Sequence, residues 1–162
     1  MLITSIFSTP SNDAIILANA STLLGNEEGF KSSPYLDIAQ VPTIGFGTVY
    51  YLNGTKVTMN DSPISLGEGL VLLNKRLSDE FLPALKSLCP TLITINQAVA
   101  LLSFVYNEGV HALANSTLRR KVLASDWAGA AAEFPKWNMA GGQVSHGLQN
   151  RRAVEQALFN TP

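Results

Sequence analysis

The chain has 162 residues and a mass of 17.4 kDa, which is the size of one domain. Its 46% apolar and 14% charged residues exclude extensive disorder, because that composition supplies ample material for a core. The formal net charge of −1 argues against nucleic acid as a partner, since binding a phosphate backbone requires a strong positive excess. A single cysteine, Cys89, excludes an intramolecular disulfide scaffold.

The first third of the chain predicts a helix followed by a small sheet. Ser11 and Asn12 can cap a helix that ends near residues 27–29. The β-branched and aromatic residues over 35–59 then indicate a sheet of at most three strands. Within it, 49–57 has the pattern of a hairpin closed by a tight Asn-Gly turn.

The rest of the chain predicts helices. Ser65 with Glu68, and Thr94 with Gln97, are two capping-box patterns. The first begins a long linking helix, and the second begins a helix that is apolar nearly all round and therefore buried. Shorter helices are expected after residues 116 and 126, and a last helix over about 147–159.

These elements predict a single domain of the α+β class that is mostly helical. We expect a tail at 1–12, a helix-and-sheet lobe at about 13–64, a linking helix at about 65–82 and a larger helical lobe at about 83–162. Ligand sites favour such a junction between lobes. No stretch approaches the ~20 apolar residues of a membrane span, so no stable membrane insertion is expected.

The acidic residues after the first helix are the best candidates for chemistry. Glu27 and Glu28 fall where the helix dipole disfavours a carboxylate, and a broken local rule suggests a function. Asp37 and Thr43 follow at the entrance to the sheet. Two carboxyl groups across a groove suit glycoside hydrolysis, although Asp37 also fits a turn and Thr43 an ordinary strand position. No metal is expected, because His111 and His146 lack ligands at metal-binding spacing.

Several ordered motifs carry a family resemblance. They are Glu28-Gly29-Phe30, Pro34-Tyr35-Leu36-Asp37, Pro42-Thr43-Ile44-Gly45-Phe46-Gly47, Leu102-Ser103-Phe104-Val105-Tyr106-Asn107-Glu108-Gly109, Ser116-Thr117-Leu118, Trp137-Asn138, Gly141-Gly142, Gly147-Leu148, Arg151-Arg152 and Leu158-Phe159. Together they resemble the phage-type lysozymes, the endolysins of glycoside hydrolase family 24. The resemblance implies a lysozyme-like fold without a cofactor and a muramidase activity. Its substrate would be the β-1,4 bond between N-acetylmuramic acid and N-acetylglucosamine in peptidoglycan.

The resemblance also implies a role for each catalytic residue. The family's pattern of Glu, eight residues, Asp, five residues, Thr is met by Glu28, Asp37 and Thr43. Glu28 would be the general acid, Asp37 the second carboxylate and Thr43 the hydroxyl that helps to position the attacking water. If Asp37 acts through water, the anomeric centre inverts, and this is the outcome we expect.

Further positions match the family's cleft more loosely. The expected glycan contacts are Gly47, Val49, Phe104, Thr117 and Asn150. Phe104 also fits core packing, and Asn150 also fits a helix surface. Two residues depart from the family pattern: Thr48 stands where His is frequent, and Gln40 stands where Gly is common. These departures concern the loop geometry more than the chemistry.

The charge distribution suggests how a wall enzyme would bind its substrate. Residues 1–81 carry a net charge of −4 and residues 82–162 one of +3. The second half could hold an anionic wall through Arg119, Arg120, Lys121, Lys136, Arg151 and Arg152, or these residues could form an ordinary solvated surface with one arginine paired to Glu155.

Two other functions remain open at this stage. One is a lytic transglycosylase, which needs a single acid and releases an anhydro sugar. The other is a catalytically silent wall-binding domain. The leading expectation is a monomeric enzyme that acts on peptidoglycan glycan strands during host-cell lysis. It would be made in the host cytoplasm and would reach the wall through a holin-like membrane-permeabilising partner.

Overall fold

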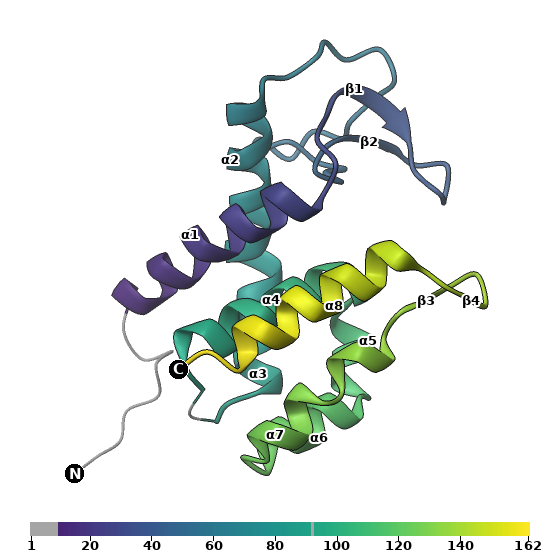
Figure 1. The fold of residues 1–162 in the computed structure, drawn as a ribbon. Helices are drawn as coiled ribbons and strands as arrows, with labels where there is room; N and C mark the ends of the chain where they lie inside the picture. Colours follow the sequence, from purple (N-terminus) through teal and green to yellow (C-terminus); the bar gives the residue numbers. More distant parts are fainter. Residues whose placement is uncertain (1–9, 92) are drawn as a thin grey trace.

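The structure is a computed structural model that describes residues 10–91 and 93–162. Helix α1 (Pro10–Glu27) leads to a small sheet, and a long helical segment returns from the sheet to a bundle of helices (Figure 1). α1 begins slightly earlier than expected, with proline at its first position, where a missing N–H costs nothing. Ile16, Ala20 and Leu24 of α1 are completely buried in the same core as the bundle.

The sheet has two antiparallel strands, β1 (Lys31–Leu36) and β2 (Pro42–Gly45). The hairpin predicted over 49–57 is present, but it is irregular and forms no regular strands: the Tyr51 N–H donates to the Thr55 carbonyl at 2.9 Å and the Val57 N–H to the Val49 carbonyl at 2.8 Å. That segment forms a turn, with one isolated bridge between Tyr50 and Lys56. Tyr50 and Leu52 are more than half exposed and Val57 is the one buried residue of 49–57, so little buried surface is available there to stabilise a longer ladder.

The turn between β1 and β2 holds Gln40 in the left-handed region, with φ at 61°. This conformation is unfavourable for a side chain with a Cβ. Gln40→Gly is therefore expected to raise the free energy of unfolding by about 0.5–1 kcal/mol, measured by urea denaturation. Ala39→Gly, at a neighbouring exposed position without a positive φ, is the control and should lower it. Equal effects of the two changes would contradict this explanation.

The linking helix is longer than expected and changes its winding midway. It comprises α2 (Leu66–Arg76), a π-helical turn η2 (Leu77–Phe81) and α3 (Leu82–Leu88). The capping box of Ser65 and Glu68 is present at its start, as predicted. A π-helical turn inside a longer helix frequently marks a functional position.

The bundle is centred on α4 (Ile95–Glu108), which begins at the predicted capping box of Thr94 and Gln97. α4 packs against α1 and α8. The other elements are α5 (Val110–Ala114), α6 (Thr117–Leu123), α7 (Trp127–Ala131), η3 (Phe134–Lys136), β3 (Met139–Ala140), β4 (Gln143–Val144) and α8 (His146–Phe159).

The β3–β4 hairpin was not predicted, although its turn has a clear sequence signal. Gly141 and Gly142 both have positive φ, as the tight hairpin turn requires. The structure is thus mostly helical with small two-stranded sheets, which confirms the expected fold class. Within the described part of the chain, none of the helices is long and apolar enough to cross a membrane.

Candidate active site

Glu28 lies directly after the last residue of α1. Its backbone N–H donates to the Leu24 carbonyl at 2.8 Å, which fixes the residue to the helix end. Its side chain is 27% exposed, and its Oε1 lies 2.6 Å from Nη1 of Arg151 on α8. An ion pair between residues 123 positions apart in the chain therefore fixes the Glu28 carboxyl between α1 and α8.

Arg151 belongs to a buried charge network. Its Nε lies 3.3 Å from Glu155 Oε1, and the Ser103 hydroxyl donates to the same oxygen at 2.7 Å. Arg152 Nε lies 3.2 Å from the other Glu155 oxygen. Burial raises the pKa of Glu155, although both arginines and Ser103 oppose this effect, and burial lowers the pKa of Arg152.

This buried network contradicts part of the prediction that basic side chains of the second half form a surface for an anionic wall. Arg151 and Arg152 are buried, so they are not available to an extended anionic surface. Lys121 pairs with Asp126 at 2.7 Å, and Lys136 pairs with Glu133 at the same distance. The alternative of an arginine paired with Glu155 is correct, but both arginines take part and the site is interior rather than solvated.

Asp37 and Thr43 lie at the β1–β2 turn. Asp37 Oδ1 accepts hydrogen bonds from the backbone N–H groups of Ala39 and Val41, both at 2.8 Å. The turn thereby orients the carboxylate, so the turn role and a catalytic role are compatible. Thr43 is 2% exposed, and its hydroxyl donates to the Val41 carbonyl at 2.9 Å. Its lone pairs remain acceptors, but the residue has almost no contact with bulk solvent.

A crevice of about 270 Å³ opens beside Glu28, between the sheet and the helices. It is lined by Glu28, Gly29, Tyr35, Phe46, Gly47, Arg76, Tyr106 and Asn107. The structure thus brings Gly47 to Glu28 as expected, whereas Asp37 and Thr43 are not among the lining residues of this crevice.

Tyr35 connects the crevice with the other two predicted catalytic residues. It is paired with Thr43 across the sheet. Burial raises the pKa of Tyr35, and the negative charges of Asp37 and Glu28 raise it further. The Tyr35 hydroxyl therefore lies within the electrostatic reach of both carboxylates, at the edge of the crevice where Glu28 stands.

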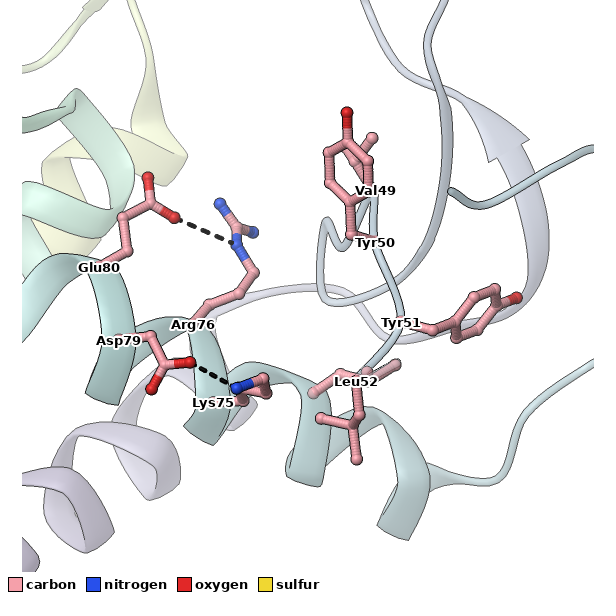
Figure 2. A pocket seen from close by; sticks show the side chains of 9 residues that line it. Val49, Tyr50, Tyr51, Leu52, Lys75, Arg76, Asp79 and Glu80 are labelled. Atoms are coloured by element: carbon pink, nitrogen blue, oxygen red, sulfur yellow. Dashed lines mark hydrogen bonds and ion pairs between the residues drawn. The ribbon is translucent and has the colours of Figure 1, made fainter. Parts of the chain in front are cut away.

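The other predicted glycan contacts lie in different parts of the fold. Val49 lines a neighbouring groove of about 370 Å³ between 49–52 and the linking helix (Figure 2). Asn150 is exposed on α8, next to Arg151. Thr117 begins α6, where its hydroxyl accepts a 2.6 Å hydrogen bond from Arg120. Neither Asn150 nor Thr117 lines the crevice at Glu28.

Phe104 is corrected from a cleft residue to a core residue. Its side chain is completely buried, with ring centroids 5.9 Å from Phe134 and 5.1 Å from Trp137. Tyr106, two residues further along α4, faces the crevice instead. Burial raises the pKa of Tyr106 to about 12, so its hydroxyl stays a hydrogen-bond donor across the physiological range.

Sequence reasoning missed six further residues around Glu28: Gly29, Tyr35, Phe46, Arg76, Tyr106 and Asn107. Tyr106 and Asn107 lie two and three residues after Phe104 on α4, a helix that is apolar nearly all round, so its sequence gives no signal for the face that meets the crevice. Within 10–91 and 93–162, no group of three or more histidine, cysteine, aspartate or glutamate residues is arranged to hold a metal ion.

Together, the fold and the site define a class of protein. A carboxyl group at a helix end, a second one on a sheet turn and a crevice between sheet and helices are features that a two-carboxylate glycosidase would use. The family model described as phage lysozyme matches residues 25–155, and the chain therefore belongs to the phage lysozyme family.

Individual relatives agree with this assignment. The endolysin of Bacillus phage PZA is 54% identical over 69 residues, which cover 43% of this chain and 27% of that protein. The SAR-endolysin of Escherichia phage Mu is 36% identical over 133 residues, covering 82% and 74%. The crystal structure of a mutant of P22 lysozyme superposes with a TM-score of 0.80 at 32% identity, covering 89% of this chain and 97% of that one.

Proposed function

We propose that this protein is a muramidase that hydrolyses the β-1,4 bond between N-acetylmuramic acid and N-acetylglucosamine in peptidoglycan, in host-cell lysis. The observation that carries the proposal is the position of Glu28, in the crevice between sheet and helices, with its carboxyl held by Arg151. Membership of the phage lysozyme family supports the same reaction and substrate.

The proposed mechanism assigns one task to each residue. Glu28 protonates the glycosidic oxygen as the bond to the leaving sugar breaks. Asp37 acts through a water molecule that attacks the opposite face of the ring, so the anomeric centre inverts. Thr43 supports that water through its acceptor lone pairs. The Asp37 turn supports this role because two backbone N–H groups fix the carboxylate.

The products of purified peptidoglycan test the reaction. Hydrolysis should release new reducing ends, and mass spectrometry should find muropeptides that contain the added water. Products lighter by one water would indicate a 1,6-anhydro sugar and a lytic transglycosylase instead. Wall binding without any product would indicate a silent domain. Proton NMR of the first-formed anomer then decides whether the configuration inverts.

We propose that the glycan extends along the crevice past Gly47 and into the groove at Val49, with Asn150 at the edge of the site. Gly47 supports this because it lines the crevice directly. The same proposal treats the whole chain as one lysozyme-like domain that works as a monomer.

We also propose synthesis in the host cytoplasm and release through a membrane-permeabilising partner. The buried thiol of Cys89 supports folding in a reducing compartment, because the fold uses no disulfide and burial raises the pKa of this thiol to about 11. Expression with and without such a partner tests the proposal. Lysis without the partner would contradict it.

A further inference from the structure

Arg76 occupies a position that the proposed mechanism does not use. It is the last residue of α2, directly before the π-helical turn, and its side chain is one-third exposed. It lines the crevice at Glu28 and also the groove at Val49. Figure 2 shows its guanidinium group extending from the helix, beside Glu80. Arg76 therefore lies between the crevice at Glu28 and the groove at Val49 and lines both.

The contacts of Arg76 join three parts of the molecule. Its Nη1 donates to the Gly47 carbonyl at 2.8 Å and to the Tyr106 hydroxyl at 3.3 Å. The Tyr106 hydroxyl in turn donates to the Phe46 carbonyl. The guanidinium carbon lies 5.3 Å from the Tyr106 ring centroid and 5.4 Å from that of Phe81. A single cation thus links the sheet, the linking helix and α4.

The loop that Arg76 holds is closed by its own backbone hydrogen bonds. Ile44 and Thr48 exchange two backbone hydrogen bonds of 2.9 Å, which close the loop between them. Gly47 within this loop has a φ of 86°, which presents its carbonyl to Arg76. Because the loop is closed on itself, a tie to Gly47 fixes the position of the whole loop relative to α4.

We propose that Arg76 is a positioning residue that holds the 44–48 loop against Tyr106 and thereby sets the width of the crevice in front of Glu28. This inference rests on the proposed muramidase function for its kinetic consequence. Its structural consequence, the spacing of sheet and helices, does not depend on that function. A hydrogen bond from a charged donor is stronger than one from a neutral donor. Losing the hydrogen bond from Arg76 to Gly47 should therefore change the width of the crevice.

The kinetic test is Arg76→Met. It should lower kcat on peptidoglycan at least about tenfold while KM changes little, because misplacement of the order of 1 Å can cost about 100-fold in rate. Arg76→Lys should recover part of kcat, since a lysine ammonium can reach one acceptor. Tyr106→Phe should also lower kcat. The double variant Arg76→Met with Tyr106→Phe should have a kcat no lower than that of the less active single variant. Lys86→Met, a charge loss on α3 at a residue that lines neither the crevice nor the groove, is the control and should leave kcat unchanged.

The structural test uses spin labels at Lys56→Cys and Ala124→Cys, two exposed positions on the sheet side and the helical side. Cys89 is buried and should stay unlabelled. In Arg76→Met, the distribution of distances between the two labels should shift to longer values or broaden. If Arg76→Met does not fold, the same measurement is made on Arg76→Lys. An unchanged distribution overturns the proposal, as does a raised KM with kcat retained. Inactive wild-type protein would refute the proposed function, whereas the distance measurement would still test Arg76.

Discussion

Glu28→Gln is expected to lower the rate of reducing-end release from purified peptidoglycan by about 10²- to 10⁴-fold, the usual contribution of a general acid. Glutamine has nearly the shape of glutamate but has no acidic proton for the leaving oxygen. Its side-chain oxygen can still accept a hydrogen bond from Arg151, so the link between α1 and α8 is weakened rather than removed. The change should therefore reduce activity far more than it reduces folding.

Glu27→Gln is the matched control. Glu27 is the last residue of α1, is exposed and has the same charge as its neighbour. Losing it should leave the rate within about threefold of wild type, because a side chain outside the crevice makes no contact in the transition state. Equal losses in the two variants, or near wild-type activity of Glu28→Gln, would contradict the assignment of the acid. Circular dichroism and thermal unfolding of both variants show whether the fold persists.

The fold could be predicted where its signals are local. Ser65 with Glu68, and Thr94 with Gln97, form capping boxes within four residues of chain, and both are present in the structure. Strand pairing is less local, since it depends on which face becomes buried. The 49–57 segment has a good turn sequence but buries only Val57 completely, so the regular strands of the sheet form earlier in the chain.

The candidate site, too, could be predicted only where its signals are local in the sequence. Glu28, Asp37 and Thr43 lie within sixteen residues, so a linear motif identifies them together. Arg151 contacts Glu28 from 123 residues away, and no spacing rule predicts that contact.

The prediction of Phe104 as a glycan contact failed for a physical reason. Phe104 and Tyr106, which does line the crevice, point about 200° apart on an α-helix. α4 is apolar nearly all round, so its sequence does not reveal which face meets the core. Only packing against α1 and α8 settles which face is buried.

Glu155→Leu is expected to lower the free energy of unfolding by about 3–5 kcal/mol, which is the typical effect of breaking a buried ion pair. Glu155 is 1% exposed and Arg152 is completely buried. Removing the carboxylate leaves the Arg152 charge in the interior with Glu108, at 3.5 Å, as a partner, and also removes one of the groups that hold Arg151. Urea denaturation followed by circular dichroism measures the loss.

Asp79→Asn tests whether burial or the distance between the charged atoms determines how much the loss of an ion pair destabilises the fold. The Lys75–Asp79 pair is closer, at 2.5 Å, but both side chains are about half exposed. Water screens such a pair, so its loss should destabilise the fold far less than the loss of Glu155 does. If the distance between the charged atoms decided the energy, Asp79→Asn would be the more damaging change, and that result would contradict our explanation.

The double variant Arg152→Met with Glu155→Leu tests whether the cost of Glu155→Leu comes from an uncompensated charge. Removing both charges avoids the buried cation, so the double variant should be more stable than Glu155→Leu alone by at least about 1 kcal/mol. Additive losses would show instead that the packing of the two side chains is what matters. Because Glu155 also contacts Arg151, Glu155→Leu should loosen the carboxyl of Glu28 as well, so its activity should fall even under conditions where it is fully folded.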